Sequence, residues 1–435
     1  MKYTSNIQAF SNSPDDLESL YQSARQANEE AEFRSDLQEV SGKSPENILL
    51  SAWNARFTHM PLLKAKRTTN WLLAVILGLV TGAILFSISG PSLTIKNGVP
   101  YIVLLWAPIA TIPTLIFLAA VSKRNYLYTG LTALALIALS IYSLLMIPGV
   151  PGMRSNDYLI LMLFLLPLLC WIGLGVAVLK FKSSTSNRFA FMIKSIEVMI
   201  TAGIYLIAGV AFGMITIAMF AALNVTLSDV LMRLAVSVGF GLIPIMAVAT
   251  MYDPLQQPEA QDFSQGLSKF IFTMMRLLLP LTLIVLVIYL FAIPFNFMAP
   301  FQNRNLLIVY NVMQFAIIGL LIGATPLKLD DLSEKLQTWL RRGILAVAIL
   351  ALLVSLYAFS AVVYRTVGEF LTLNRLTIIG WNIINIAILF MLIYTQFVQK
   401  NPAWNERLQN IFSKATTVYL VWSVFLTLAL PLIFR

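Results

Sequence analysis

The sequence predicts an all-α protein: a polytopic bundle of about eleven transmembrane helices, preceded by a small helical hairpin. Hydrophobic residues make up 58% of the 435-residue chain and charged residues only 11%, whereas soluble domains carry about 25% charged residues. Apolar runs of membrane-spanning length recur after the first 62 residues, which are polar and acidic. We therefore expect two parts, an N-terminal segment over residues 1–62 and a transmembrane domain over residues 63–435.

The N-terminal segment contains two helix starts. Ser13-Pro14 and Ser44-Pro45 each place a capping hydroxyl before a proline, with acidic residues in the turn that follows, and this order is typical of helix N-termini. With Gly42 in the turn between them, the pattern predicts a cytosolic hairpin over residues 13–57. So small a unit buries little apolar surface, which favours docking on the membrane domain or on a protein partner.

A helix needs about 20 mostly apolar residues to cross a bilayer. Eleven runs meet this requirement. We predict spans at 71–90, 101–121, 126–148, 157–180, 192–222, 230–251, 271–297, 305–325, 343–364, 376–398 and 415–434.

The basic residues predict the orientation of these spans, because short loops rich in Lys and Arg stay on the cytoplasmic side. With the N-terminus inside, 17 Lys and Arg residues lie at inner loops and their edges and 6 at outer ones. The N-terminus is therefore expected in the cytoplasm and the C-terminus outside the cell membrane. Membrane topology also accounts for the net charge of +10, so we expect no nucleic-acid partner.

Two inner loops are longer than the others. Residues 252–268 and 326–342 are each compatible with a short helix at the membrane surface or with an ordinary connector. The second has leucines and Trp339 at helical spacing beside its charges, a pattern that suits the headgroup boundary.

Charged residues within the spans are few: Lys194, Glu197, Arg233 and Arg276. An isolated charge in mid-bilayer is costly, so such residues are paired or functional. Lys194 and Glu197 are one helical turn apart and can face one another, which leaves a local structural pair or a role in transport for Glu197. Arg233 and Arg276 lie near span ends, from which they can reach the headgroups.

The outer loop before the tenth span is dense in polar residues. Arg365, Glu369 and Arg375 can form a charge-assisted network, while Asn382 and Asn385 share one helical face and need partners on other helices. The network would lock two spans together, or its arginines would hold an anionic lipid headgroup or a phosphate.

The same stretch carries a resemblance. An arginine, an acidic residue, Leu371-Thr372 and Asn374-Arg375 form a pattern that resembles the domain-of-unknown-function 4153 family of bacterial multi-pass membrane proteins. The resemblance covers about residues 360–390, and Phe370 stands where a glycine is expected. It implies a protein of the bacterial inner membrane and supplies no activity.

Motifs for chemistry are missing from the sequence. Cys170 and His59 are the only residues of their kinds, so a Cys/His metal cluster is not expected, and we predict neither catalytic residues nor a cofactor. Three roles remain open: a scaffold or accessory subunit with a partner-docking hairpin, in contact with membrane lipid; a transporter or channel for a small or anionic solute; and a lipid-linked membrane transferase.

Overall fold

The computed structural model describes residues 2–26, 29–59, 69–95, 98–123, 125–149, 153–180, 183–263, 266–329, 332–368, 370–398 and 404–434. The chain divides into two compact units, Met1–Thr69 and Asn70–Arg435, and each is considered by itself. The predicted domain boundary at 62/63 lies outside the described residues.

The N-terminal unit is more elaborate than the predicted hairpin. Its described residues form four helices, which are α1 (Thr4–Ala9), α2 (Pro14–Gln26), α3 (Glu30–Lys43) and α4 (Ile48–His59). Helix α2 begins at Pro14 as expected, but Gly42 lies inside α3 instead of in a turn. The second predicted start is also wrong, since Asn47 caps α4 by accepting a hydrogen bond from the Leu50 amide at 3.1 Å.

Aromatic packing explains why this unit is more than a hairpin. Tyr21, Phe33, Trp53 and Phe57 come from three helices and pack with ring centroids 5.1 to 6.4 Å apart. Phe33, on the helix that the sequence reading missed, is fully buried. At the surface, Lys2 and Tyr3 donate hydrogen bonds to Glu29, and these bonds lower the pKa of the Glu29 carboxyl below its usual value.

The second unit is built from long apolar helices. Ten of the described helices are long and apolar enough to cross a membrane, and α5, with 17 residues, is shorter. The protein is thus a multi-pass membrane protein with one apolar helix in each predicted span region. The bounds are α5 (Trp71–Ser87), α6 (Tyr101–Ser122), α7 (Tyr126–Gly149), α8 (Met153–Leu179), α9 (Thr185–Ala222), α10 (Asp229–Met251), α11 (Gly266–Ala292), α13 (Arg304–Ala324), α14 (Glu334–Val367), α15 (Leu373–Val398) and α16 (Trp404–Ile433).

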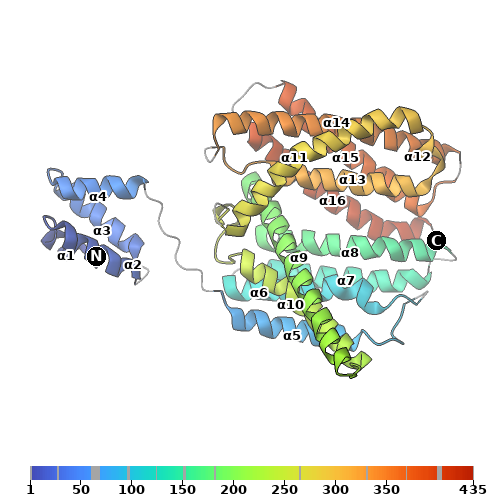
Figure 1. The fold of residues 1–435 in the computed structure, drawn as a ribbon, viewed down its shortest axis with the longest axis horizontal. Helices are drawn as coiled ribbons and strands as arrows, with labels where there is room; N and C mark the ends of the chain where they lie inside the picture. Colours follow the sequence, from blue (N-terminus) through green and yellow to red (C-terminus); the bar gives the residue numbers. More distant parts are fainter. Residues whose placement is uncertain are drawn as a thin grey trace. The chain divides into compact units, whose positions relative to one another are not determined.

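Most of these helices run side by side, whereas α9 crosses the others obliquely (Figure 1). We call the end at which α8 ends and α9 begins the inner end, because the charge pattern predicts that it faces the cytoplasm, and the opposite end the outer end. The largest apolar core joins the start of α9 to α11 and α13–α16. Helices α5, α6 and α10 share a second core, and α6–α8 pack with α15 and α16 in another.

Helices α5 and α10 approach unusually closely. A Cβ atom added at Gly241 would lie 2.4 Å from the Gly82 nitrogen and 2.6 Å from the Gly78 oxygen. Only glycine allows these two backbones to touch, as at small-residue crossings of membrane helices. The crossing fixes the position of α10, whose inner half forms part of the site described below.

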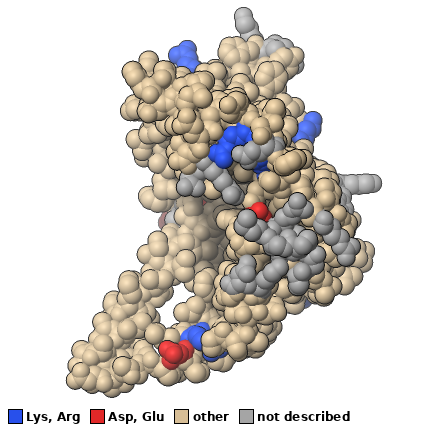
Figure 2. Space-filling model, turned by 90° about the vertical axis from the view of Figure 1, so that its right-hand side faces the viewer, with Lys and Arg blue, Asp and Glu red and all other residues tan. Residues whose placement is uncertain are grey.

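The outer half of α9 projects from the unit. From Ile204 to Ala222 it has no charged residue, and most of its large side chains are exposed. Figure 2 shows this arm, with the start of α10, extending at the lower left. An apolar surface of this kind is satisfied by lipid.

Neither inner loop forms the surface helix considered for it. In the first, the described residues form the short 3₁₀-helix η2 (Pro258–Ala260) and, from Gly266, the start of α11. Side-chain hydrogen bonds hold the stretch around η2. In the second, the amphipathic residues after Ser333 belong to the first turns of α14. Helix α14 continues through them because no proline separates them from the span.

Candidate functional site

A buried ion pair lies at the inner end of α9. Lys194 Nζ is 2.6 Å from Glu197 Oε2, and the two side chains are only 4% and 1% exposed. Ser268 of α11 donates a hydrogen bond to the same carboxylate oxygen at 2.8 Å. The pair that the helical spacing allowed is therefore present and is tied to a second helix.

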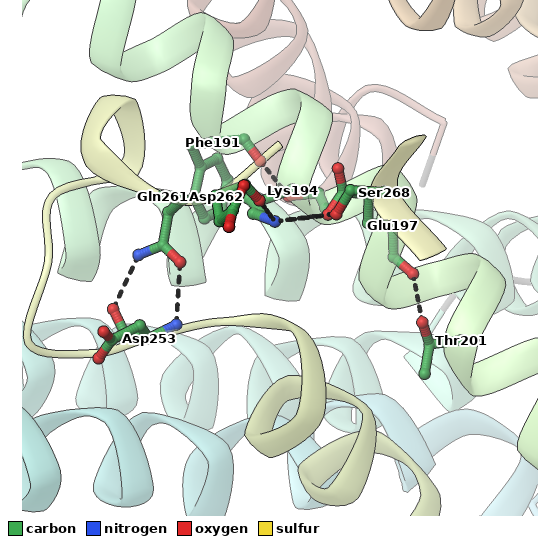
Figure 3. Close-up of polar contacts among 9 residues, drawn as sticks. Phe191, Lys194, Glu197, Thr201, Asp253, Gln261, Asp262 and Ser268 are labelled. Atoms are coloured by element: carbon green, nitrogen blue, oxygen red, sulfur yellow. Dashed lines mark hydrogen bonds and ion pairs between the residues drawn. The ribbon is translucent and has the colours of Figure 1, made fainter. Parts of the chain in front are cut away.

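The ammonium group also holds the loop that joins α10 to α11. Lys194 Nζ donates to the carbonyl of Asp262 at 2.7 Å and lies 4.5 Å from the centroid of the Phe263 ring. In Figure 3 the loop approaches Lys194 from one side, and Ser268 lies on the other side of the lysine. Glu197 Oε1 is buried, and no described residue donates a hydrogen bond to it. The carboxylate is thus only half satisfied by the described part of the chain.

The side-chain amides of Asn187 and Gln261 hold the same loop, the first by bonding it to α9 and the second by bonds within the loop. Asn187 donates to Gln257 Oε1 at 2.9 Å and accepts from the Glu259 amide at 3.1 Å. Gln261 accepts from the Asp253 amide at 3.0 Å and donates to its carbonyl at 2.8 Å, as Figure 3 also shows. These bonds satisfy backbone groups that would otherwise be orphaned near the membrane. The loop is therefore an ordered wall.

The loop borders one of two adjoining cavities. The first, which we call the vestibule, has a volume of ≈ 440 Å³ and polar lining from Asn125, Lys180, Asn187 and the loop. The second, the chamber, has a volume of ≈ 260 Å³ and lies among α6, α8, α9 and α10. Its walls are almost wholly apolar, and Lys194 and Ser195 also contribute to the lining.

Leu118, Val178 and Tyr252 line both cavities, so these three residues form the partition between vestibule and chamber. Burial raises the pKa of Tyr252 far above its usual value, and the adjacent Asp253 adds to the effect. A polar space thus adjoins an apolar space across one layer of side chains.

Prolines shape the chamber. Pro167 of α8 and Pro244 of α10 both line it and lie inside helices that continue through them. Each proline lacks an N–H and so frees a carbonyl one turn earlier. Trp171 also lines the chamber, and no described residue accepts a hydrogen bond from its buried indole N–H. Trp171, in the chamber wall, therefore carries an unused donor.

The predicted partners of the two asparagines on α15 are on α13 and α16. Asn382 donates to Asn311 at 2.8 Å, and Asn385 donates to Gln314 at 3.4 Å and accepts from Tyr419 at 2.7 Å. Both asparagines are buried. This ladder joins three helices, so its role is to fix their packing.

The outer corner is less ordered by contacts. Arg375 Nη1 donates to the carbonyl of Phe370 at 2.9 Å, and no described residue accepts from the buried Arg365 Nη1. Glu369, the proposed centre of the network, lies outside the described residues. The structure therefore does not bring the three predicted residues together as one described site.

The two remaining intramembrane arginines, Arg233 and Arg276, contact residues outside the inner site. Arg233 donates to Ser89 Oγ from Nε and Nη2 at 3.3 and 3.2 Å and lies over the ring of Phe86. Arg276 lies 5.9 Å from the ring centroid of Phe272. Neither residue lines the vestibule or the chamber.

The sequence reading missed most of the inner site. It identified Lys194 and Glu197, but not Ser268, Asn187 or Gln261, which lie up to 74 residues away along the chain. One signal was available: Asp253, Gln257 and Gln261 make the 252–268 loop richer in hydrogen-bonding side chains than a plain connector needs.

Among the described residues, no group of three His, Cys, Asp or Glu side chains could hold a metal ion. No family model, curated protein or solved structure matches this chain. The resemblance to the domain-of-unknown-function 4153 family accordingly stays a prediction.

Proposed function

We propose that this multi-pass membrane protein binds an amphipathic, lipid-like molecule from the inner side of the membrane, as a transporter or carrier of such solutes. The observation that carries the proposal is the shared lining of vestibule and chamber by Leu118, Val178 and Tyr252. A molecule with a polar head and an apolar tail fits this arrangement, in which a polar cavity adjoins an apolar one.

The residues suggest how such a molecule is held. The vestibule presents the side chains of Asn125, Lys180 and Asn187 to a polar head. The chamber presents apolar walls to the tail and one unused donor, the Trp171 N–H, to an ester or carbonyl oxygen. Binding is favoured because the tail leaves water when it fills the chamber. It is favoured also because the Trp171 N–H gains a hydrogen-bond acceptor that the described residues do not provide.

The Lys194–Glu197 pair contributes by holding the wall. Its bond to the Asp262 carbonyl ties to α9 the loop that lines the vestibule, beside the bonds that Asn187 makes to the same loop. The Glu197 oxygen that has no described donor supports a transport role for this carboxylate, since intramembrane carboxylates mark ion and proton pathways.

The single cysteine of the chain provides the test, because Cys170 is only 2% exposed and lines the chamber. The full chain is reconstituted in phosphatidylcholine vesicles, and labelling of Cys170 by N-ethylmaleimide is followed by mass spectrometry. Lysophosphatidylglycerol is expected to slow labelling several-fold, whereas glycerol 3-phosphate, which has no tail, is expected to leave it unchanged.

A matched pair of variants localises the protection. Ala110→Leu narrows the chamber that Ala110 lines, while Ala208→Leu adds the same side chain at an exposed position of α9. Protection by the lysolipid should fall in the first variant and persist in the second. Equal labelling with and without lysolipid in the unmodified chain would reject the proposed binding.

A second role rests on the N-terminal unit. It has its own aromatic core and forms a compact unit of the chain, which suits docking of a protein partner through residues 13–57 in an accessory subunit. Photo-crosslinking from Ile48, whose side chain is 85% exposed, tests this role. A single crosslinked protein of fixed mass supports it, and crosslinks to lipid alone contradict it.

A further inference from the structure

A third cavity opens at the inner end, between the first turns of α9 and α16. Its volume is ≈ 740 Å³, and its lining includes Thr185 and Ser186 from α9, Lys328 from the α13–α14 loop, and Asn405 and Arg407 from α16. Ser184, the residue before α9, lines both this cavity and the vestibule. The two spaces therefore lie on either side of the same helix start.

Two long helices begin at this cavity. Helix α9 has 38 residues and α16 has 30, and the first N–H groups of any α-helix lack intrahelical acceptors. The aligned peptide dipoles place partial positive charge at both starts. Ser184 Oγ already accepts from the Asn187 amide at 3.2 Å, which leaves the preceding N–H groups of α9 for another acceptor.

A buried amide provides the second, independent observation. The side chain of Asn405 is 5% exposed and lines the cavity, yet no described residue makes a hydrogen bond to its amide group. Although the residue as a whole is buried, it lines the cavity, so its amide is reached from that space. A molecule bound in the cavity can therefore supply the partner that the described residues do not.

The charged lining favours an anion. Lys328 and Arg407 carry positive charge, and Glu406, which also lines the cavity, carries the only negative charge among the residues of that lining. The loop bearing Lys328 is held in place, because Gln409 donates to the carbonyls of Pro326 and Leu327 at 2.9 and 3.1 Å. The cation is thereby presented from a fixed backbone.

From this arrangement we propose that the cavity binds a phosphate ester. Arg407 and Lys328 supply the charge, and the Asn405 amide and the helix N–H groups donate hydrogen bonds to the phosphate oxygens. The ester is the headgroup of an anionic lipid or a free phosphate compound. This site is separate from the vestibule and does not depend on the function proposed above.

The test uses the full chain in nanodiscs of phosphatidylcholine, with or without one part in five of phosphatidylglycerol. Phosphatidylglycerol retained after delipidation is counted by mass spectrometry, and Tm is measured with and without inorganic phosphate. Asn405→Leu removes hydrogen bonds without changing charge and should lower retention or phosphate affinity about tenfold. Lys328→Gln should lower it about fivefold.

Arg342→Gln is the control, since Arg342 is an exposed inner-end cation that does not line the cavity, and this variant should behave as the unmodified chain. Retention of phosphatidylglycerol that the two cavity variants lose identifies a lipid headgroup. A Tm increase by inorganic phosphate in pure phosphatidylcholine, lost in the same variants, identifies a free phosphate. The absence of both effects, or an equal loss in Arg342→Gln, overturns the proposal. Because Lys328 is exposed, its variant tests the site even where Asn405→Leu impairs folding.

Discussion

The inner end and the outer corner of the membrane unit differ in how their charges are used. At the inner end, Lys194 bonds to Glu197 and to the backbone of a loop 68 residues away in sequence, and that loop lines the vestibule. At the outer corner, Arg375 bonds to a carbonyl five residues away. The corner is the richer of the two in charge along the sequence, yet the described contacts that join separate helices are at the inner end.

The difference shows that charge density along a chain is a poor guide to a site in a membrane protein. Charges near a span end can reach water and headgroups, so they need no partner. A charge that is buried among helices must be satisfied by the protein. Burial of the charged group, which the sequence does not report, separates the two cases.

Loss of the Lys194 charge is the largest expected effect. Lys194→Met leaves the Glu197 carboxylate buried without its cation, and breaking a buried pair in this way costs about 3–5 kcal/mol. The free energy of unfolding in detergent, measured by denaturant titration, should fall by that amount. The double variant Lys194→Met/Glu197→Met should recover most of the loss; a double variant as unstable as the single one would contradict this account.

Gly241→Ala tests whether the inner site depends on the α5–α10 crossing. The new methyl group would meet the backbone of α5 at 2.4 Å, so the helices must separate, at a cost of about 1–3 kcal/mol. Gly239→Ala is the matched control, because a Cβ atom at that position meets nothing within 4 Å. Thermal unfolding should distinguish the two variants, and Cys170 labelling should accelerate only in the first. Equal Tm values would show that the crossing is not tight.

Asn385→Leu tests the polar ladder between the two ends. The change removes the acceptor of the Tyr419 hydroxyl and the donor to Gln314. Interhelical hydrogen bonds in membranes contribute about 0.6 kcal/mol on average and up to about 1.7, so the stability should fall within that range. Tyr419→Phe removes one of these bonds and should cost less. A larger loss for Tyr419→Phe would assign the ladder's stability to another contact.

Arg375→Ala should have the smallest effect. The hydrogen bond described for it is exposed, and exposed hydrogen bonds and ion pairs of arginine contribute about 1 kcal/mol or less. Retention of phosphatidylglycerol by this variant should equal that of the unmodified chain. A clear loss of lipid with normal folding would identify the outer corner as an anion site and would contradict the difference between the inner end and the outer corner.

The membrane helices could be predicted because lipid imposes a simple length and composition rule. Each predicted span contains an apolar helix, and α14 and α16 merely begin earlier than expected, at Glu334 and Trp404, because polar turns extend a helix beyond the lipid. The N-terminal unit was read less well. The sequence analysis does not predict α3, although Phe33, Leu37 and Val40 have helical spacing, because a glycine between two helix starts favours a turn at Gly42.

The site could be predicted only where its residues are neighbours in sequence. Lys194 and Glu197 are three residues apart and their pairing follows from helix geometry. Asn187 meets Gln257 only because α9 and the α10–α11 loop fold together. Asn405 lies in a cavity wall only because of how the start of α16 packs. Neither fact has a local signal in the sequence.

The length of α9 has a mechanical consequence for the surrounding bilayer. At 1.5 Å per residue its 38 residues extend about 57 Å, nearly twice the thickness of a hydrocarbon core of about 30 Å. Its outer half carries no charge to stop it within the lipid, so the helix must incline or the bilayer must thicken around it. The protein should therefore partition into thicker membrane regions, and the tilt of α9 should respond to acyl-chain length.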